Sequence, residues 1–232
     1  MTTKRYRSVF FDLDNTLWDF TSNSNRAFAL LHKKYGFDRK GIPLARLLEV
    51  YHHYNDLMWE EYRQGRLDKE TLRWKRFYLT FDELGMPDEQ LARQMDVEYL
   101  ETSKQMTGLV EGSREILEYL KERYPLYLLT NGFNEVQFTK IHNSGLEPYF
   151  EKVITSEMAG ALKPHPAFFE YALRVTGSAA AGAVMIGDDA VTDIQGAADA
   201  GIDTILFNPT GRAHTTLPTY EIRQLAELKD IL

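Results

Sequence analysis

The sequence of 232 residues contains no cysteine. It can therefore form neither a disulfide framework nor a thiolate nucleophile, and it cannot build a zinc site from cysteine ligands. Positive charge is also scarce, because 27 lysines and arginines stand against 34 aspartates and glutamates, which gives a net charge of -7. This balance argues against a protein that binds a nucleic-acid polymer through broad electrostatic attraction.

Long apolar runs are absent as well. No stretch of the chain approaches the length of a membrane span, and no apolar segment of signal-peptide length follows the basic residues 1–7. We therefore expect a cytoplasmic protein with no membrane partner. Apolar residues make up 44% and charged residues 26% of the chain, which is ordinary for a globular protein of enzyme size. The length allows one large domain or a domain with an insertion.

The first apolar run, residues 9–11, has the length and composition of a buried strand, and Asp12 and Asp14 follow it. Side chains two apart on a strand share a face, so these carboxylates would repel each other by about 4 kcal/mol at ~4 Å and an effective dielectric near 20. Such a pair favours a cation or a shared proton. A strand end with turn-forming polar residues would show the same pattern.

From residue 18 to residue 105 the apolar residues recur at helical spacing. Breaks that contain glycine or proline lie at residues 36, 41–43, 65 and 85–87, and they separate four long helical segments. The pattern predicts a four-helix unit, residues 18–105, that is inserted directly after the first strand. Residues 1–17 and 106–232 would then form one domain.

That second part of the chain alternates between strand and helix. Apolar runs that predict strands lie at residues 126–129, 153–154, 183–186 and 204–207, and helical segments precede them or lie between them. This alternation predicts an α/β fold, a Rossmann-like, doubly wound and mostly parallel sheet covered by helices on both faces. Ligands of such sheets bind beyond the carboxyl ends of the strands.

Thr130, Asn131 and Gly132 follow the second strand. Asn-Gly is typical of a hairpin, but the apolar residues after it have helical spacing, which favours a strand-to-helix turn. In such a turn a hydroxyl and backbone N–H groups can hold a phosphoryl oxygen. Lys163 is the next candidate. A lone lysine usually lies in solvent, but the proline after it disfavours helical geometry and restricts its direction.

Asp188, Asp189 and Asp193 follow the most apolar strand. Asp189 and Asp193 lie at the predicted start of a helix, where an aspartate commonly caps the helix. Capping would explain one of these two aspartates. It would not explain why the remaining acids lie at the sheet edge to which Asp12 and Asp14 also point. Oxygen ligands without cysteine or a suitably spaced histidine pair favour Mg²⁺.

In their order along the chain these segments resemble the four motifs of the haloacid dehalogenase (HAD) superfamily. They read Asp12-Leu13-Asp14-Asn15-Thr16-Leu17, Leu129-Thr130-Asn131-Gly132, Leu162-Lys163-Pro164 and Ile186-Gly187-Asp188-Asp189 with Asp193. The resemblance covers the whole chain, and the inserted helical unit resembles the C1 cap of that superfamily. Phe20, residues 59–65 and residues 130–133 are most similar to its house-cleaning pyrimidine 5'-nucleotidases.

The resemblance implies a Mg²⁺-dependent phosphomonoester hydrolase that acts through an aspartyl-phosphate. Asp12 would attack phosphorus, and Asp14 would protonate the leaving oxygen and then deprotonate water. Thr130, the Asn131 backbone N–H and Lys163 would bind the phosphoryl group.

The resemblance also implies a set of metal ligands. Asp12, the backbone carbonyl of Asp14, and Asp188 would hold Mg²⁺, with Asp189 or Asp193 in a supporting role. We expect a small phosphorylated metabolite as substrate, specifically a pyrimidine nucleoside 5'-monophosphate, with Trp18 and Phe20 as first candidates for contact with it. We expect a monomer or a homodimer.

Other functions fit parts of the sequence. A sugar-phosphate or phosphoglycolate-type phosphatase, or a mutase, is compatible with every motif. Asp14 argues against a 2-haloacid dehalogenase, because that chemistry lacks the second aspartate. A receiver-like regulatory domain also combines clustered acids with a threonine and a lysine, but the large insertion argues against it. A binding protein without catalysis would not need the full set of motif residues.

Overall fold

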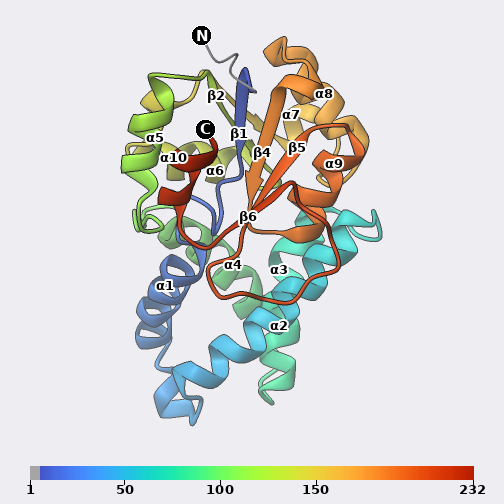
Figure 1. The fold of residues 1–232 in the computed structure, drawn as a ribbon. Coiled ribbons are helices and arrows are strands. Elements are labelled where there is room, and N and C mark those ends of the chain that lie inside the picture. The colour runs from blue at the N-terminus through green and yellow to red at the C-terminus, as the bar shows by residue number, and fades with distance from the viewer. Residues whose placement is uncertain (1–5) are drawn as a thin grey trace. The chain divides into compact units, whose positions relative to one another are not determined.

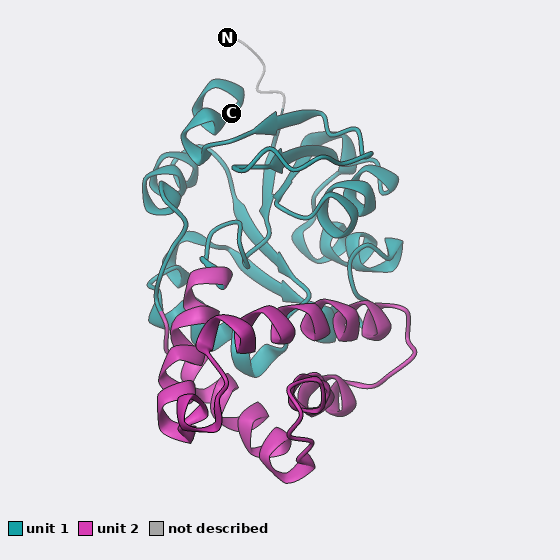
Figure 2. Cartoon of the chain, turned by 90° about the horizontal axis from the view of Figure 1, so that it is seen from below, with its two compact units in different colours: residues 1–20, 107–232 teal, residues 21–106 magenta. Residues whose placement is uncertain are grey.

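The computed structural model of the protein describes residues 6–232. Residues 1–5, which the sequence prediction assigned to the first domain, lie outside the described part. The described residues form two compact units, shown in Figure 2: the sheet unit, residues 6–20 and 107–232, and the helical unit, residues 21–106. The predicted division differs from this one at residues 18–20 and 106. The roles of the units as core and cap stay a prediction.

The sheet unit is built on six parallel strands in the order β3-β2-β1-β4-β5-β6. Their bounds are β1 Ser8–Phe11, β2 Leu126–Thr130, β3 Lys152–Thr155, β4 Ala183–Gly187, β5 Asp203–Phe207 and β6 Tyr220–Ile222. The three central strands are buried along their whole length, as their uninterrupted apolar sequences require. The prediction of a doubly wound parallel sheet is confirmed.

Helices lie on both faces of this sheet, with α5 and α10 on one side and α8 and α9 on the other in Figure 1. One layer of the core joins alternate residues of β1, β2 and β4 to Phe168 and Phe169 of α8. The helices of this unit are α5 Ser113–Lys121, α6 Asn134–Asn143, α7 Ser156–Ala159, α8 Pro166–Thr176, α9 Gly196–Asp199 and α10 Leu228–Ile231.

The helical unit contains α1 Phe20–Tyr35, except for its first residue, together with α2 Leu44–Arg63, α3 Lys69–Glu83, α4 Glu89–Ser103 and a 3-10 helix, Phe37–Lys40. A common apolar core that includes Phe28, Tyr51, Phe77 and Tyr99 joins its helices. Aspartates cap α3 and α4, because the side chains of Asp68 and Asp88 accept hydrogen bonds from backbone N–H groups of the first turn. Among residues 6–232, no helix has both the length and the apolar composition that crossing a membrane requires.

Candidate active site

Asp12 lies directly beyond β1, where the strand pairing continues for one more residue. Its backbone N–H donates to the carbonyl of Ile186 in β4 (2.9 Å), and Asp12 is only 7% exposed. The chain then turns at Asn15, which has a left-handed φ of 61°, a conformation that asparagine adopts more readily than most residues. Because of this turn, the chain folds back and Trp18 pairs with Asp14.

Lys163 is the buried cation that binds Asp12 and Asp193. Its Nζ donates to Asp12 Oδ1 (2.7 Å), to Asp193 Oδ1 (2.6 Å) and to the carbonyl of Leu129 in β2 (2.9 Å). An ammonium has three N–H groups, and these contacts use all of them. Burial alone would lower the pKa of Lys163, but the two carboxylates raise it above the usual value. Lys163 is therefore positively charged.

Asn131 fixes the backbone at Lys163. Its side-chain amide donates to the carbonyl of Lys163 (2.9 Å) and its side-chain oxygen accepts from the N–H of the same residue (2.8 Å). The end of β2 thus orients the loop that carries the lysine. The Asn131 side chain thus binds the protein backbone. The contact expected between the Asn131 backbone N–H and a phosphoryl group stays a prediction.

Asp188 and Asp193 approach Asp12 from beyond β4. Thr16 donates to Asp188 Oδ1 (3.3 Å), and Asp193 lies in a π-helical turn, Ala190–Gln195, where it is 1% exposed. Its carboxylate packs so closely against Gly187 that a Cβ atom at that position would collide with it. The glycine at the end of β4 is therefore required by the approach of Asp193.

Asp189 has a different role from Asp193. Its carboxylate accepts from the N–H groups of Val191 and Thr192 (both 2.8 Å), so it caps the π-helical turn. The side chain of Asp193 instead accepts from the Asp189 N–H (3.2 Å) and binds Lys163. Of these two supporting candidates, the structure places Asp193 in the charged cluster and Asp189 at the start of the turn.

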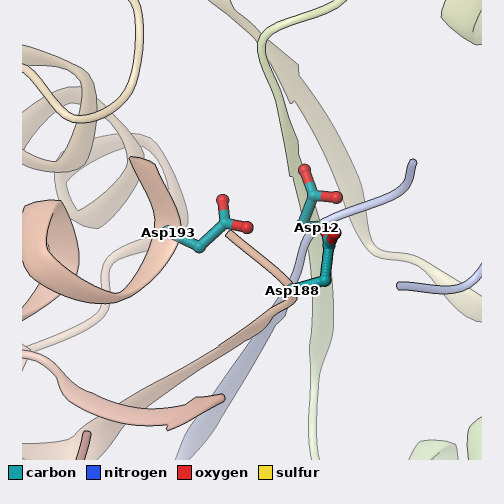
Figure 3. A group of neighbouring side chains, drawn as sticks. All are labelled: Asp12, Asp188 and Asp193. Carbon is teal, nitrogen blue, oxygen red and sulfur yellow. The ribbon is translucent and has the colours of Figure 1, made fainter. Parts of the chain in front are cut away.

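The carboxylates of Asp12, Asp188 and Asp193 form the acidic group, and one oxygen from each lies within 4.8 Å of the others. Figure 3 shows the three side chains arriving from separate segments around a common space. Burial raises the pKa of Asp12 well above the usual range, and the surrounding carboxylates raise it further while Lys163 lowers it. Burial likewise raises the pKa of Asp193 and that of Asp188, the latter to about 7, with neighbouring carboxylates adding to the effect.

Asp14 stands outside this group, and two residues of α6 hold it. Gln137 Nε2 donates to Asp14 Oδ2 (2.8 Å), and Lys140 Nζ donates to Asp14 Oδ1 (2.7 Å). Lys140 is only 4% exposed, and its ammonium lies 4.2 Å from the centre of the Trp18 ring. Since Trp18 is itself fully buried, its ring is not exposed to a substrate.

Gln137 and Lys140 were not among the site residues predicted from the sequence. They are three apart and so lie on one face of α6, and the one signal that could have found them is their place in the helix that begins just after Thr130-Asn131-Gly132. Polar residues at helical spacing are usually read as a solvent face. Here that face is buried.

Thr130 is 1% exposed and its hydroxyl oxygen accepts two hydrogen bonds, from Gln137 Nε2 (2.7 Å) and from the Gly132 N–H (3.1 Å). A hydroxyl that accepts twice has its single proton left to donate. Gly132 permits this arrangement, because a Cβ atom there would collide with the Gln137 side chain. The end of β2 therefore presents a donor that suits an anionic oxygen.

The chain is similar to known proteins over nearly its whole length. A family model described as haloacid dehalogenase-like hydrolase matches residues 6–201. The chain is 33% identical over 232 residues to the pyrimidine 5'-nucleotidase PynA of Streptococcus pneumoniae, a match that covers 98% of this chain and 95% of PynA. It is 30% identical over 248 residues to the human N-acylneuraminate-9-phosphatase, covering all of this chain and 96% of the relative.

A solved structure is also similar over nearly the full length. YfnB of Bacillus subtilis, described as a HAD-hydrolase, is 33% identical over 234 residues, covering 99% of this chain and 96% of YfnB. Its crystal structure, bound to magnesium, matches with a TM-score of 0.87 and 30% identity over 98% of this chain and 99% of that chain.

Replacement of Lys163 tests the charge balance of the site. Lys163→Met would leave buried carboxylates without their cation, and removal of one partner from a buried ion pair typically costs about 3–5 kcal/mol. We expect a loss of that size in the free energy of unfolding, measured by urea denaturation at pH 8 with a chelator. Lys229→Met, at an exposed lysine of the same unit, should change it by less than about 0.5 kcal/mol. Equal effects of the two replacements would contradict the assigned charge balance.

Proposed function

Because the chain belongs to the haloacid dehalogenase-like hydrolase family, we propose that it hydrolyses phosphomonoesters with Mg²⁺ and through a phosphorylated Asp12. The observation that carries the proposal is the acidic group around a single buried lysine. A lone ammonium cannot balance three carboxylates. The pKa of each is raised, first by burial and further by neighbouring carboxylates, although Lys163 lowers it.

The acidic group fits Mg²⁺ by its chemistry. It offers only oxygen ligands from a few carboxylates, and Mg²⁺ in proteins commonly binds one or two carboxylates together with water and substrate phosphate. Asp12 and Asp188, with the backbone carbonyl of Asp14, would hold the ion, while Asp193 would orient Lys163. The bound ion would supply a positive charge that polarises the phosphoryl oxygens and offsets negative charge in the transition state.

The proposed reaction has two steps. An oxygen of Asp12 attacks phosphorus, the bond from phosphorus to the leaving oxygen breaks, and Asp14 gives that oxygen a proton. Water then attacks phosphorus, Asp14 takes a proton from it, and the bond to Asp12 breaks to release inorganic phosphate. The single contact that Lys163 makes with Asp12 Oδ1 orients the nucleophile in both steps.

Thr130 would hold a phosphoryl oxygen with the hydroxyl proton that its two accepted hydrogen bonds leave over. Lys163 would act on the phosphoryl group through its charge and not through a hydrogen bond, because its three N–H groups already bind protein oxygens. A preorganised donor and a nearby fixed charge are what phosphoryl transfer requires, since the protein stabilises charge that spreads over the oxygens.

The substrate we propose is a pyrimidine nucleoside 5'-monophosphate. The support is the 33% sequence identity to a pyrimidine 5'-nucleotidase over nearly the whole of both chains. A sugar phosphate is the second candidate, because a phosphatase of an acylated sugar acid is also 30% identical over the whole chain. Asp14 counts against a dehalogenase, whose reaction needs no proton transfer of this kind.

Replacement of the nucleophile tests the chemistry. Asp12→Asn keeps the shape of the side chain but removes its nucleophilicity, so hydrolysis of phosphomonoesters should fall to background. The measurement is phosphate release in Mg²⁺, together with a binding assay for inorganic phosphate, which the variant should retain. Asp230→Asn, at an exposed aspartate, serves as the control and should keep full activity. Substantial turnover by Asp12→Asn would refute the covalent mechanism.

Magnesium binding should be visible as stabilisation that grows with pH. The pKa of Asp188 in the folded protein is about 7, against a usual value of 3.8, so without metal the stability that this group contributes is present at low pH and is lost as the pH rises through about 7. Mg²⁺ competes with the protons, so its stabilising effect should be larger at pH 8 than at pH 5.5.

At a hundredfold excess over Kd the gain would be about 2.7 kcal/mol, or several degrees in Tm. Differential scanning fluorimetry with Mg²⁺ and with a chelator measures it. Asp188→Asn should lose the response, while Asp230→Asn should retain it. A shift of Tm that is equal at both pH values, or that survives in Asp188→Asn, would place the metal elsewhere.

Substrate preference is tested with a panel of phosphomonoesters. We expect kcat/KM for UMP and dTMP to exceed that for AMP, glucose 6-phosphate, phosphoglycolate and N-acylneuraminate 9-phosphate by about tenfold or more, because contact with a base is worth roughly 1–3 kcal/mol in proteins that stack bases. Phe20, which is partly exposed, remains a candidate for that contact. A preference for the sugar phosphates would favour the second candidate and leave the phosphatase chemistry in place.

A further inference from the structure

The two oxygens of Asp14 are each held by a residue outside the four motifs. Lys140 and Gln137 both belong to α6, and each donates one hydrogen bond to the carboxylate, at 2.7 and 2.8 Å. The Asp14 side chain keeps 30% of its surface exposed. It is therefore accessible on one side and fixed on the other.

Lys140 is placed as a fixed cation. Lysine is almost never fully buried unless it is paired, and Lys140 is 4% exposed. The face of Trp18 lies 4.2 Å from its ammonium, and a ring face attracts a cation most strongly where water is excluded. The lysine of the ion pair with Asp14 is therefore buried against the Trp18 ring, which leaves it less room to move than the lysine of a surface pair has.

Gln137 links Asp14 to the phosphate-binding hydroxyl. Its Nε2 donates to Asp14 Oδ2 and to Thr130 Oγ1, while its own Oε1 is buried without a hydrogen-bond partner among the described residues. An unsatisfied buried acceptor costs about 1–3 kcal/mol. If the amide were turned around, its oxygen would face the Asp14 carboxylate. The two hydrogen bonds that Nε2 donates therefore determine the observed orientation of the amide.

We propose that Gln137 and Lys140 are positioning residues that set the direction of the Asp14 carboxylate relative to the phosphoryl group bound at Thr130. The inference rests on the proposed function, in which Asp14 transfers a proton. A general acid works only within hydrogen-bond reach of the leaving oxygen, and a small misplacement of a catalytic group can cost about a hundredfold in rate. The two residues of α6 provide that placement.

Leaving-group dependence distinguishes positioning from a structural role. Lys140→Met keeps the length and the apolar contact with Trp18 and removes one donor to Asp14. Gln137→Met keeps the volume but also removes the donor to Thr130, so Lys140→Met carries the kinetic test. For an alkyl phosphate such as glycerol 3-phosphate we expect kcat to fall about 10- to 100-fold, and for p-nitrophenyl phosphate, whose leaving group needs little protonation, less than about threefold. KM should change little for either substrate. Lys140→Arg, which retains a donor, should recover much of the loss.

The Asp14→Asn background supplies the matching control. Groups that act as a unit have non-additive effects, so Lys140→Met should cost little more once the acid is gone. Lys229→Met, at an exposed lysine, should have no effect in either background. An equal loss with both substrates, or a full additional loss in the Asp14→Asn background, would overturn the assignment.

A structural measurement separates this inference from the proposed function. In crystals of Lys140→Met and Gln137→Met, the Asp14 side chain should leave its position or occupy more than one. If the wild-type protein hydrolysed no phosphomonoester but Asp14 moved as expected, the proposed function would fail and the positioning would stand. An Asp14 side chain unchanged in both variants would refute the positioning whatever the activity.

Discussion

The contact between the Lys163 ammonium and its three oxygens is the interaction on which the site depends. It joins Asp12 beyond β1, the carbonyl of Leu129 in β2, and Asp193 in the turn that follows β4. Each of these segments ends a different strand, so a single buried charge holds their ends in register. The same charge is too small to neutralise the acidic group, and that deficit makes the site suitable for a divalent cation.

The order of the strands explains why these ends meet. From β1 the chain proceeds through β2 and β3 toward one edge of the sheet, and then returns to β4 on the other side of β1 before it reaches β5 and β6. In a parallel sheet this reversal leaves a crevice at the carboxyl ends of the central strands. The ends of β1, β2 and β4 carry the charged and hydroxyl side chains of the site. Gly132 and Gly187 lie at two of these ends, where a neighbouring side chain takes the space of a Cβ atom.

Sequence patterns were sufficient for strands β1 to β5 and for placing the motif residues near one edge of the sheet, because both depend on local order along the chain. The roles of those residues stay a prediction. Apolar runs mark the central strands, and polar residues after such runs reach one edge of a parallel sheet. The different roles of Asp189 and Asp193 could not be predicted in this way. They depend on a π-helical turn in which the N–H of Ile194 reaches back to the carbonyl of Asp189 (3.3 Å), and spacing does not distinguish that turn from an ordinary helix start. Gln137 and Lys140 were missed because their burial depends on how α6 packs.

Asp12 and Asp14 follow the same strand, and their sequence spacing predicts mutual repulsion. The structure gives each carboxylate its own lysine: Lys163 binds Asp12, and Lys140 binds Asp14. The turn at Asn15 brings Trp18 back beside Asp14. The ring that contacts Lys140 is therefore supplied by the residue four positions after Asp14 in the chain. Two acids with separate cations can point in different directions and take different roles. In the proposed mechanism, Asp12 stays with the other carboxylates as nucleophile and metal ligand, while Asp14 keeps one face open for proton transfer.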